Sequence, residues 1–247
     1  MGAAWPSATD STPQRPLLRR GSVLEPTVNT PPAPARTPTL PIIHAVTSDE
    51  IVSRDDFIDV ACAVMAALGA RGALHLRAGR ISAARLQTLA GGLEAAQAIT
   101  GAWLIVNDRI DLALGARARG AQLTSRSLRV ADARRAAPGL ALGASVHSIQ
   151  EARVAVNEGA TWLVAGHVFA TESHPGTEGR GLSFVRALTS AMTVPVVAIG
   201  GVRPEHCRVL RAAGAYGLAV IRGIWDAPNA ERAASDYLSA YDDAAGA

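Results

Sequence analysis

Eight short runs of apolar and β-branched residues recur along this chain, and a longer segment separates each run from the next. The runs are Leu40–Thr47, Ala73–Arg77, Trp103–Asn107, Ala121–Thr124, Ala141–Val146, Trp162–Val168, Pro195–Ile199 and Gly217–Ile221. Apolar residues at helical spacing mark the segments Arg54–Leu68, Ala83–Ile99, Ile149–Glu158, Leu182–Ala191, Pro204–Ala213 and Asn229–Asp242. Eight parallel strands with right-handed crossovers close into a barrel, so we expect an α/β fold with a single-domain (β/α)₈ TIM barrel over residues 40–247.

An open, doubly wound sheet is the alternative arrangement of such a repeat. It would normally carry a glycine-rich dinucleotide turn directly after the first strand, with an acidic residue about 20 positions further on. The sequence after the first run reads HAVTSDE and contains no glycine. The barrel is therefore favoured.

The first 39 residues differ from the rest in composition. They hold Pro26, Pro31, Pro32, Pro34 and Pro38, mixed with Ser, Thr and Ala. Such a segment buries too little apolar surface to offset its ordering entropy. We expect residues 1–39 to form a disordered, proline-rich N-terminal extension.

The basic residues narrow the range of chemistry. All 24 are Arg, so Schiff-base catalysis and the lysine-containing phosphate loop of nucleotide hydrolases are both excluded. Beyond residue 39 the chain carries 20 Arg against 19 acidic residues, and no Arg cluster is interleaved with aromatic residues. We therefore expect no nucleic-acid partner.

Two further features concern the protein's location. No run reaches the roughly 18 apolar residues of a membrane helix, and the amino terminus lacks the apolar run of a signal peptide. Cys62 and Cys207 are isolated from other residues at metal-ligand spacing, which favours reduced thiols. We expect a cytoplasmic protein without a membrane partner.

Glycines follow the last two strands. Gly200 and Gly201 end the seventh run, and Arg222 and Gly223 end the eighth. In barrels of this kind the corresponding loops often bind phosphate through backbone N–H groups, which needs close approach. These four residues are therefore predicted to bind a small phosphorylated ligand. Tight turns alone would also use such glycines, and Arg222 either adds charge or lies on the rim.

Several segments together resemble the thiamin phosphate synthase and TenI group of barrels. They are LHLRAGR, LIVNDRIDLALGARARGAQL, LGASVHS, LVAGHVFATESHPGTEGRGLSF, VPVVAIGGVRPEH and AYGLAVIRGIW, in the order and spacing of the group. Within the group, the synthase joins a pyrimidine pyrophosphate to a thiazole phosphate with magnesium. The TenI branch is a thiazole tautomerase that aromatises a thiazole phosphate carboxylate.

The residues that the synthase branch uses for magnesium and pyrophosphate are largely replaced here. On the second strand His75, Arg77 and Gly79 stand where synthases carry Gln, Arg and Lys. After the fourth strand, where synthases carry two acids, the sequence reads Thr124-Ser125-Arg126-Ser127. Asp108 survives on the third strand, but one carboxylate makes a weak magnesium site. We therefore expect no metal and no cofactor, with Asp108 as a capping or Arg-pairing residue.

GHVF followed by EGRG resembles the TenI branch, so the resemblance implies a metal-free isomerase of thiamin biosynthesis. His167 follows the glycine of the sixth strand and is the predicted catalytic residue, because imidazole exchanges protons near neutral pH. Thiamin phosphate synthase is the alternative enzyme. A non-catalytic protein that binds thiazole phosphate or thiamin phosphate is the third possibility.

The predicted substrate is a small phosphorylated thiazole with a carboxylate. Arg77, Ser125, Ser145 and Asn107 are its predicted binding residues, since Arg pairs bidentately with carboxylates and Ser and Asn form hydrogen bonds. The loop 170–181 is a mobile lid or a static surface loop. Related barrels commonly associate through their outer helices, so the resemblance also implies a homo-oligomer.

Overall fold

The structure is a computed structural model that describes residue 1, residues 39–172 and residues 175–244. Its folded unit begins at Thr39. The extension expected over residues 1–39 lies almost wholly outside the described residues.

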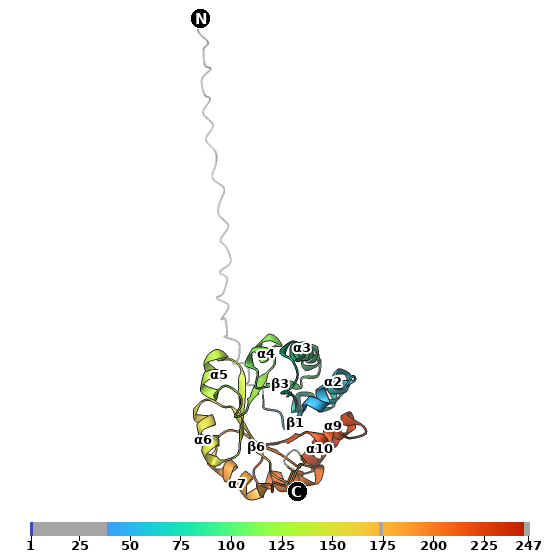
Figure 1. Cartoon of the computed structure of the whole chain (residues 1–247), viewed down its shortest axis with the longest axis vertical. Coiled ribbons are helices and arrows are strands. Elements are labelled where there is room, and N and C mark those ends of the chain that lie inside the picture. Colours follow the sequence, from blue (N-terminus) through green and yellow to red (C-terminus); the bar gives the residue numbers. More distant parts are fainter. Residues whose placement is uncertain (2–38, 173–174, 245–247) are drawn as a thin grey trace, which may run out of the picture. The chain divides into compact units, whose positions relative to one another are not determined.

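Eight parallel strands form a closed barrel in sequence order, with β8 paired to β1. The (β/α)₈ prediction is therefore confirmed, and Figure 1 shows the helices surrounding the strands. The strands are β1 (Ile43–Val46), β2 (Gly72–Leu76), β3 (Trp103–Asn107), β4 (Gly120–Leu123), β5 (Ala141–Val146), β6 (Trp162–Gly166), β7 (Val196–Ile199) and β8 (Gly217–Val220). In every pair the neighbours run parallel, as in Ala45 opposite Leu74.

The α-helices lie in the crossovers between strands and, for α9 and α10, after the last strand. They are α1 (Asp49–Val52), α2 (Phe57–Leu68), α3 (Ala83–Thr100), α4 (Ile110–Gly115), α5 (Val130–Ala136), α6 (Ile149–Asn157), α7 (Gly181–Ala191), α8 (Cys207–Ala212), α9 (Arg222–Trp225) and α10 (Ala230–Asp243). Two 3₁₀ turns, η1 (Gly69–Arg71) and η2 (Pro204–His206), complete the set. No helix in the described ranges is long and apolar enough to cross a membrane.

The helix boundaries follow from local chemistry. Ser82, Ser148 and Asn229 each accept a hydrogen bond from the backbone N–H three residues later, which begins α3, α6 and α10. The helix expected over Pro204–Ala213 divides into η2 and α8. The short helices α4 and α5 follow β3 and β4, where no residue range was predicted, because six or seven residues show too few turns for a periodic pattern.

The barrel has a core on each side of its wall. Most buried apolar side chains lie between the strands and the helices, where each parallel strand is covered. A smaller core fills the barrel interior: Val46, Ala73, Trp103, Ile105, Trp162, Val164, Val197 and Ala219. Four polar side chains of the strands, His44, His75, Asn107 and Gln122, are also buried. The interior is therefore packed, and the open space lies at the carboxyl ends of the strands.

Candidate functional site

One cavity of about 1490 Å³ opens at the carboxyl ends of the barrel strands. This end is where barrel enzymes build their sites. All nine residues singled out from the sequence line it: His167, Arg77, Asn107, Ser125, Ser145, Gly200, Gly201, Arg222 and Gly223. The nine residues therefore lie around one cavity, and their roles in binding or catalysis stay a prediction.

The loop after β7 packs tightly against the chain that follows β6. Gly200 and Gly201 have φ values of +101° and +63°, a region that favours glycine. A Cβ on Gly200 would lie 2.3 Å from the Cβ of His167, and one on Gly201 would lie 2.4 Å from the Ala170 carbonyl oxygen. Protein packing alone therefore requires both glycines. In the described chain neither glycine donates its backbone N–H to another group, which leaves both amides for a ligand.

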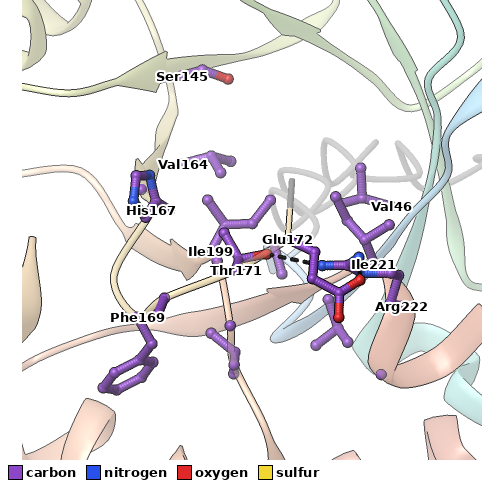
Figure 2. A pocket seen from close by; sticks show the side chains of 18 of the residues that line it. Val46, Ser145, Val164, His167, Phe169, Thr171, Glu172, Ile199, Ile221 and Arg222 are labelled. Carbon is purple, nitrogen blue, oxygen red and sulfur yellow. Dashed lines mark hydrogen bonds and ion pairs between the residues drawn. The ribbon is translucent and has the colours of Figure 1, made fainter. Parts of the chain in front are cut away.

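Arg222 lies on the same side of the mouth, where β8 ends. Its guanidinium forms an ion pair with Glu172 and donates to the Thr171 hydroxyl at 3.4 Å. Figure 2 shows this group on one side of the pocket, away from His167 and Ser145, with Val164 and Ile199 between them. Arg222 thus joins the rim of the mouth to the loop after β6.

Arginines also line the opposite side, at the ends of β2 and β4. Arg77 is half-buried, and its backbone N–H donates to the Thr47 hydroxyl at 2.8 Å. Arg126 is exposed and lies in the loop after β4. Neither guanidinium forms an ion pair with a carboxylate of the described residues. Two arginines without a described carboxylate at ion-pair distance therefore face the cavity here, although Asp49 acts on Arg77 from further away, and this charge favours an anionic ligand.

Asp108 follows β3 with φ +62° and is held by the loop after β4. Its carboxylate accepts a hydrogen bond from the Thr124 hydroxyl at 2.6 Å and another from the Ser127 hydroxyl. Asp108 does not line the cavity. These contacts tie the β3 and β4 loops together, and they are neither a helix cap nor an arginine pair, the two roles expected for Asp108.

The magnesium ion that the resemblance associates with the synthase branch does not fit these residues. No group of three His, Cys, Asp or Glu side chains in the described ranges has a metal-binding arrangement. Magnesium prefers several oxygen ligands, whereas Asp108 is engaged by two hydroxyls and Arg126 brings a positive charge to the neighbouring loop.

His167 is buried immediately after β6. Its Nε2 donates to the Glu178 carbonyl oxygen at 3.1 Å, and its own carbonyl oxygen accepts from the Arg180 N–H at 2.9 Å. Through these two contacts the C-terminal end of the loop 170–181 binds to the residue that follows β6. Ser173 and His174 of this loop lie outside the described residues, so the choice between a lid and a static loop stays a prediction.

The floor of the cavity carries polar side chains from adjacent strands. His44 Nδ1 lies 2.8 Å from His75 Nε2, and His75 Nδ1 lies 3.3 Å from the Asn107 side-chain oxygen. Gln122 Nε2 donates to the Ser145 hydroxyl at 3.0 Å. Burial lowers the pKa of His44 to about 4, and burial together with the nearby His44 lowers the pKa of His75 well below its usual value. Both histidines are therefore neutral at pH 7.

Several residues that were not expected in the site also line the cavity. Phe169 packs on the His206 ring at a centroid distance of 4.1 Å, and Arg203 and Arg126 add positive charge. His147 lines the cavity too, and its Nδ1 lies 3.2 Å from the Glu151 carboxylate. Arg126 and Arg203 closely follow the ends of β4 and β7, and this position in the sequence could have identified them as cavity residues.

A family model described as thiamine monophosphate synthase matches residues 43–224. A thiamine-phosphate synthase of Methanoculleus marisnigri is 35% identical over 203 residues, which is 80% of this chain and 95% of that protein. One of Pyrococcus horikoshii is 39% identical over 133 residues, or 54% of this chain, and the match spans 64% of that protein, just under two thirds of its length.

Solved structures agree with the fold. Thiamine phosphate pyrophosphorylase from Pyrococcus furiosus superposes with a TM-score of 0.73 at 27% identity, covering 82% of this chain and 96% of that one. A structure described as native KDPGal has a TM-score of 0.64 at 18% identity over 83% and 96% of the two chains, a likeness of fold alone.

These comparisons contradict the thiazole tautomerase predicted from the sequence, and the isomerase assignment is wrong. The relatives at 35% and 39% identity are named synthases, which are transferases. The prediction gave too much weight to GHVF and to His167, whose imidazole is anchored to the main chain of the loop after β6. That contact accounts for the position of the ring, and a catalytic role of His167 stays an untested prediction.

Proposed function

Since this chain belongs to the thiamine monophosphate synthase family, we propose that it is a transferase that joins a pyrimidine pyrophosphate to a thiazole phosphate. In this reaction a bond forms between the thiazole nitrogen and the pyrimidine methylene carbon. The carbon–oxygen bond to pyrophosphate breaks, and its electron pair leaves with the pyrophosphate. The enzyme must therefore bind two anionic groups and stabilise the charge that develops on one of them.

The observation that carries this proposal is the presence of two separate anion-binding regions in one cavity. The free amides of Gly200 and Gly201 lie after β7, and the guanidiniums of Arg77 and Arg126 lie after β2 and β4. In a closed barrel of eight strands, β3 is opposite β7. Two phosphorylated substrates, one held on each side, match this arrangement better than a single small ligand.

The proposed roles of the cavity residues divide between these two regions. The glycine amides, with Arg222 and Gly223 of the next loop, hold the phosphate of the thiazole. Arg77 and Arg126 hold the leaving pyrophosphate through charge-assisted hydrogen bonds, and Ser125 is a further donor beside them. Asn107 and Ser145 contact the pyrimidine on the floor. Each role uses a side chain or amide that lines the cavity.

The test is to mix the two substrates with the purified full chain and to measure both pyrophosphate release and thiamine phosphate formation. We expect both products in equal amounts. Absence of both, with magnesium and with EDTA, would contradict the transferase.

A second candidate is a protein that binds thiazole phosphate or thiamine phosphate without turnover. The misfit between magnesium and the loop residues Asp108 and Arg126 favours it. Titration calorimetry with thiamine phosphate separates the two, because this candidate predicts tight binding beside an inactive transfer assay.

The cellular location and the oligomeric state of the protein also remain proposals. Cys62 and Cys207 are free thiols, which fits the cytoplasmic location that we propose. Association into a homo-oligomer is tested by light scattering of the purified protein.

A further inference from the structure

Two chains of hydrogen bonds run through the barrel interior and end at the cavity floor. The first begins at the Pro41 carbonyl oxygen, which lies 2.9 Å from His44 Nε2, and continues through His75 to Asn107. The second begins at the Trp162 indole and continues through Gln122 to Ser145. Each begins at a group with a fixed role in a hydrogen bond, because the Pro41 carbonyl oxygen can only accept and the Trp162 indole N–H can only donate.

The first chain can run in one direction only. A carbonyl oxygen accepts, so His44 Nε2 carries the hydrogen. A neutral imidazole has one N–H, and therefore His44 Nδ1 accepts from His75 Nε2. His75 is also neutral because it is fully buried, so its Nδ1 carries a lone pair and needs a donor.

Asn107 must supply that donor. Its side-chain oxygen lies 3.3 Å from His75 Nδ1, yet two acceptors cannot share a hydrogen bond. The oxygen and nitrogen of an amide are nearly equal in size, and their assignment follows from the hydrogen-bond network. The network here requires the amide nitrogen to face His75, which turns the carbonyl oxygen of Asn107 away from it.

The second chain is equally constrained. The Trp162 indole N–H only donates, and it meets the Gln122 side-chain oxygen at 2.9 Å. The Gln122 amide nitrogen therefore faces Ser145 and donates to its hydroxyl. The indole is itself fixed, because a Cβ on Gly143 would lie 2.1 Å from its ring. The hydrogen of the Ser145 hydroxyl remains for another acceptor.

We infer that these two chains set the polarity of the cavity floor, with the Asn107 carbonyl oxygen as an acceptor and the Ser145 hydroxyl as a donor. His44 and His75 are positioning residues that act through Asn107. The floor thus fits a ring with one hydrogen-bond donor and one acceptor on its edge, such as an aminopyrimidine. The choice of that ring rests on the proposed function, whereas the polarity of the floor does not.

The decisive experiment determines the tautomers of the histidines in the full chain by long-range ¹H–¹⁵N NMR at pH 7. Coupling across the hydrogen bond between His75 Nε2 and His44 Nδ1 identifies the pair without any substitution. We expect both rings to be neutral with the hydrogen on Nε2. A His75 ring that carries a hydrogen on Nδ1, or on both nitrogens, would overturn the inference.

Asn107→Asp supplies a second readout. A carboxylate offers acceptors only, so we expect His75 to gain a hydrogen on Nδ1 and its ¹⁵N shifts to change accordingly. The matched control is Asn157→Asp, an exposed asparagine at the end of α6 and away from the cavity, which should leave the His75 shifts unchanged. An unchanged His75 spectrum in folded Asn107→Asp would also overturn the inference.

Ligand preference separates this inference from the proposed function. With 4-aminopyrimidine and 4-methylpyrimidine as probes, we expect roughly tenfold tighter binding of the amino compound, because the methyl group leaves the Asn107 oxygen unpaired. If neither probe binds while the tautomers are as expected, the pyrimidine proposal fails and the polarity of the floor stands. Equal binding of both probes would contradict the acceptor role of Asn107.

Discussion

The two sides of the barrel mouth hold their positions by different means. On the β6–β8 side, backbone fits against backbone, as where Gly200 and Gly201 pack on the chain after β6. On the β2–β4 side the contacts are between side chains, since Asp108 joins two loops through Thr124 and Ser127. Arg77 and Arg126 line the cavity there without a described carboxylate at ion-pair distance. Steric fit therefore restricts the residues that the β6–β8 side can accept, whereas charge restricts those on the β2–β4 side.

In terms of the proposed roles, this difference explains how one family scaffold can keep one anion site and alter another. Close packing allows little change without a cost to the fold, so the glycine loops after β7 and β8 retain the pattern expected for phosphate binding. Surface side chains on the other side can be exchanged cheaply. There an arginine takes the place of an acid that the resemblance associates with magnesium, and the charge of the site is reversed.

The largest effect should come from breaking the packed side. In Gly200→Ala the new Cβ would meet His167 at 2.3 Å while φ is +101°, so we expect the free energy of unfolding to fall by about 3 kcal/mol. Urea denaturation measures it. Gly139→Ala is the control, since no atom lies within 4 Å of its added Cβ and its change should stay within about 0.5 kcal/mol. Equal stabilities for the two variants would contradict the packing account.

Acid should weaken the β1–β3 side through its buried histidines. The pKa of His44 in the folded protein is about 4, below its unfolded value of 6.5, so the unfolded state binds the proton first. Stability is full above pH 6.5 and falls between pH 6.5 and 4, by about 1.4 kcal/mol per pH unit for this residue. His75 acts in the same direction because its pKa is also lowered. Denaturation midpoints across this range measure the slope, and a flat profile would refute it.

The charged side is tested by removing one guanidinium. Arg126→Ala should weaken the binding of inorganic pyrophosphate roughly tenfold, because one charge-assisted contact is lost. Arg85→Ala is the matched control, an exposed arginine on α3 away from the cavity, and should leave the affinity unchanged. If the two variants bind alike, Arg126 does not belong to the anion site.

A smaller effect is expected from Asp108→Asn. The amide oxygen still accepts from Thr124 and Ser127, so the unfolding free energy should fall by about 1 kcal/mol or less. Pyrophosphate affinity, followed by calorimetry, should stay within about twofold. A large loss of affinity together with unchanged stability would show that Asp108 serves the ligand after all.

The sequence predicted the barrel because its strands are separate apolar runs with helices between them. It also placed nine residues in one cavity, since the carboxyl ends of parallel strands share one rim. It could not predict the His44–His75 contact, because His44 is in register with Ala73 and the meeting with His75 depends on side-chain directions inside the barrel.

The function assigned from the sequence failed for a physical reason as well. His167 was interpreted as a proton-transfer group from its position after β6, a pattern that packing produces equally well. Its hydrogen bond to the Glu178 carbonyl depends on how the loop 170–181 folds back, which no local sequence pattern reports. Relatives named as synthases then decided against the tautomerase.

We propose that arginines, without a metal, bind the anion on the β2–β4 side. The decisive measurement is the titration of inorganic pyrophosphate into the full chain by calorimetry, in EDTA and at low salt. We expect saturable binding in EDTA that weakens as NaCl is added, because salt screens exposed charges. Absence of binding in EDTA, with saturable binding once magnesium is supplied, would contradict it.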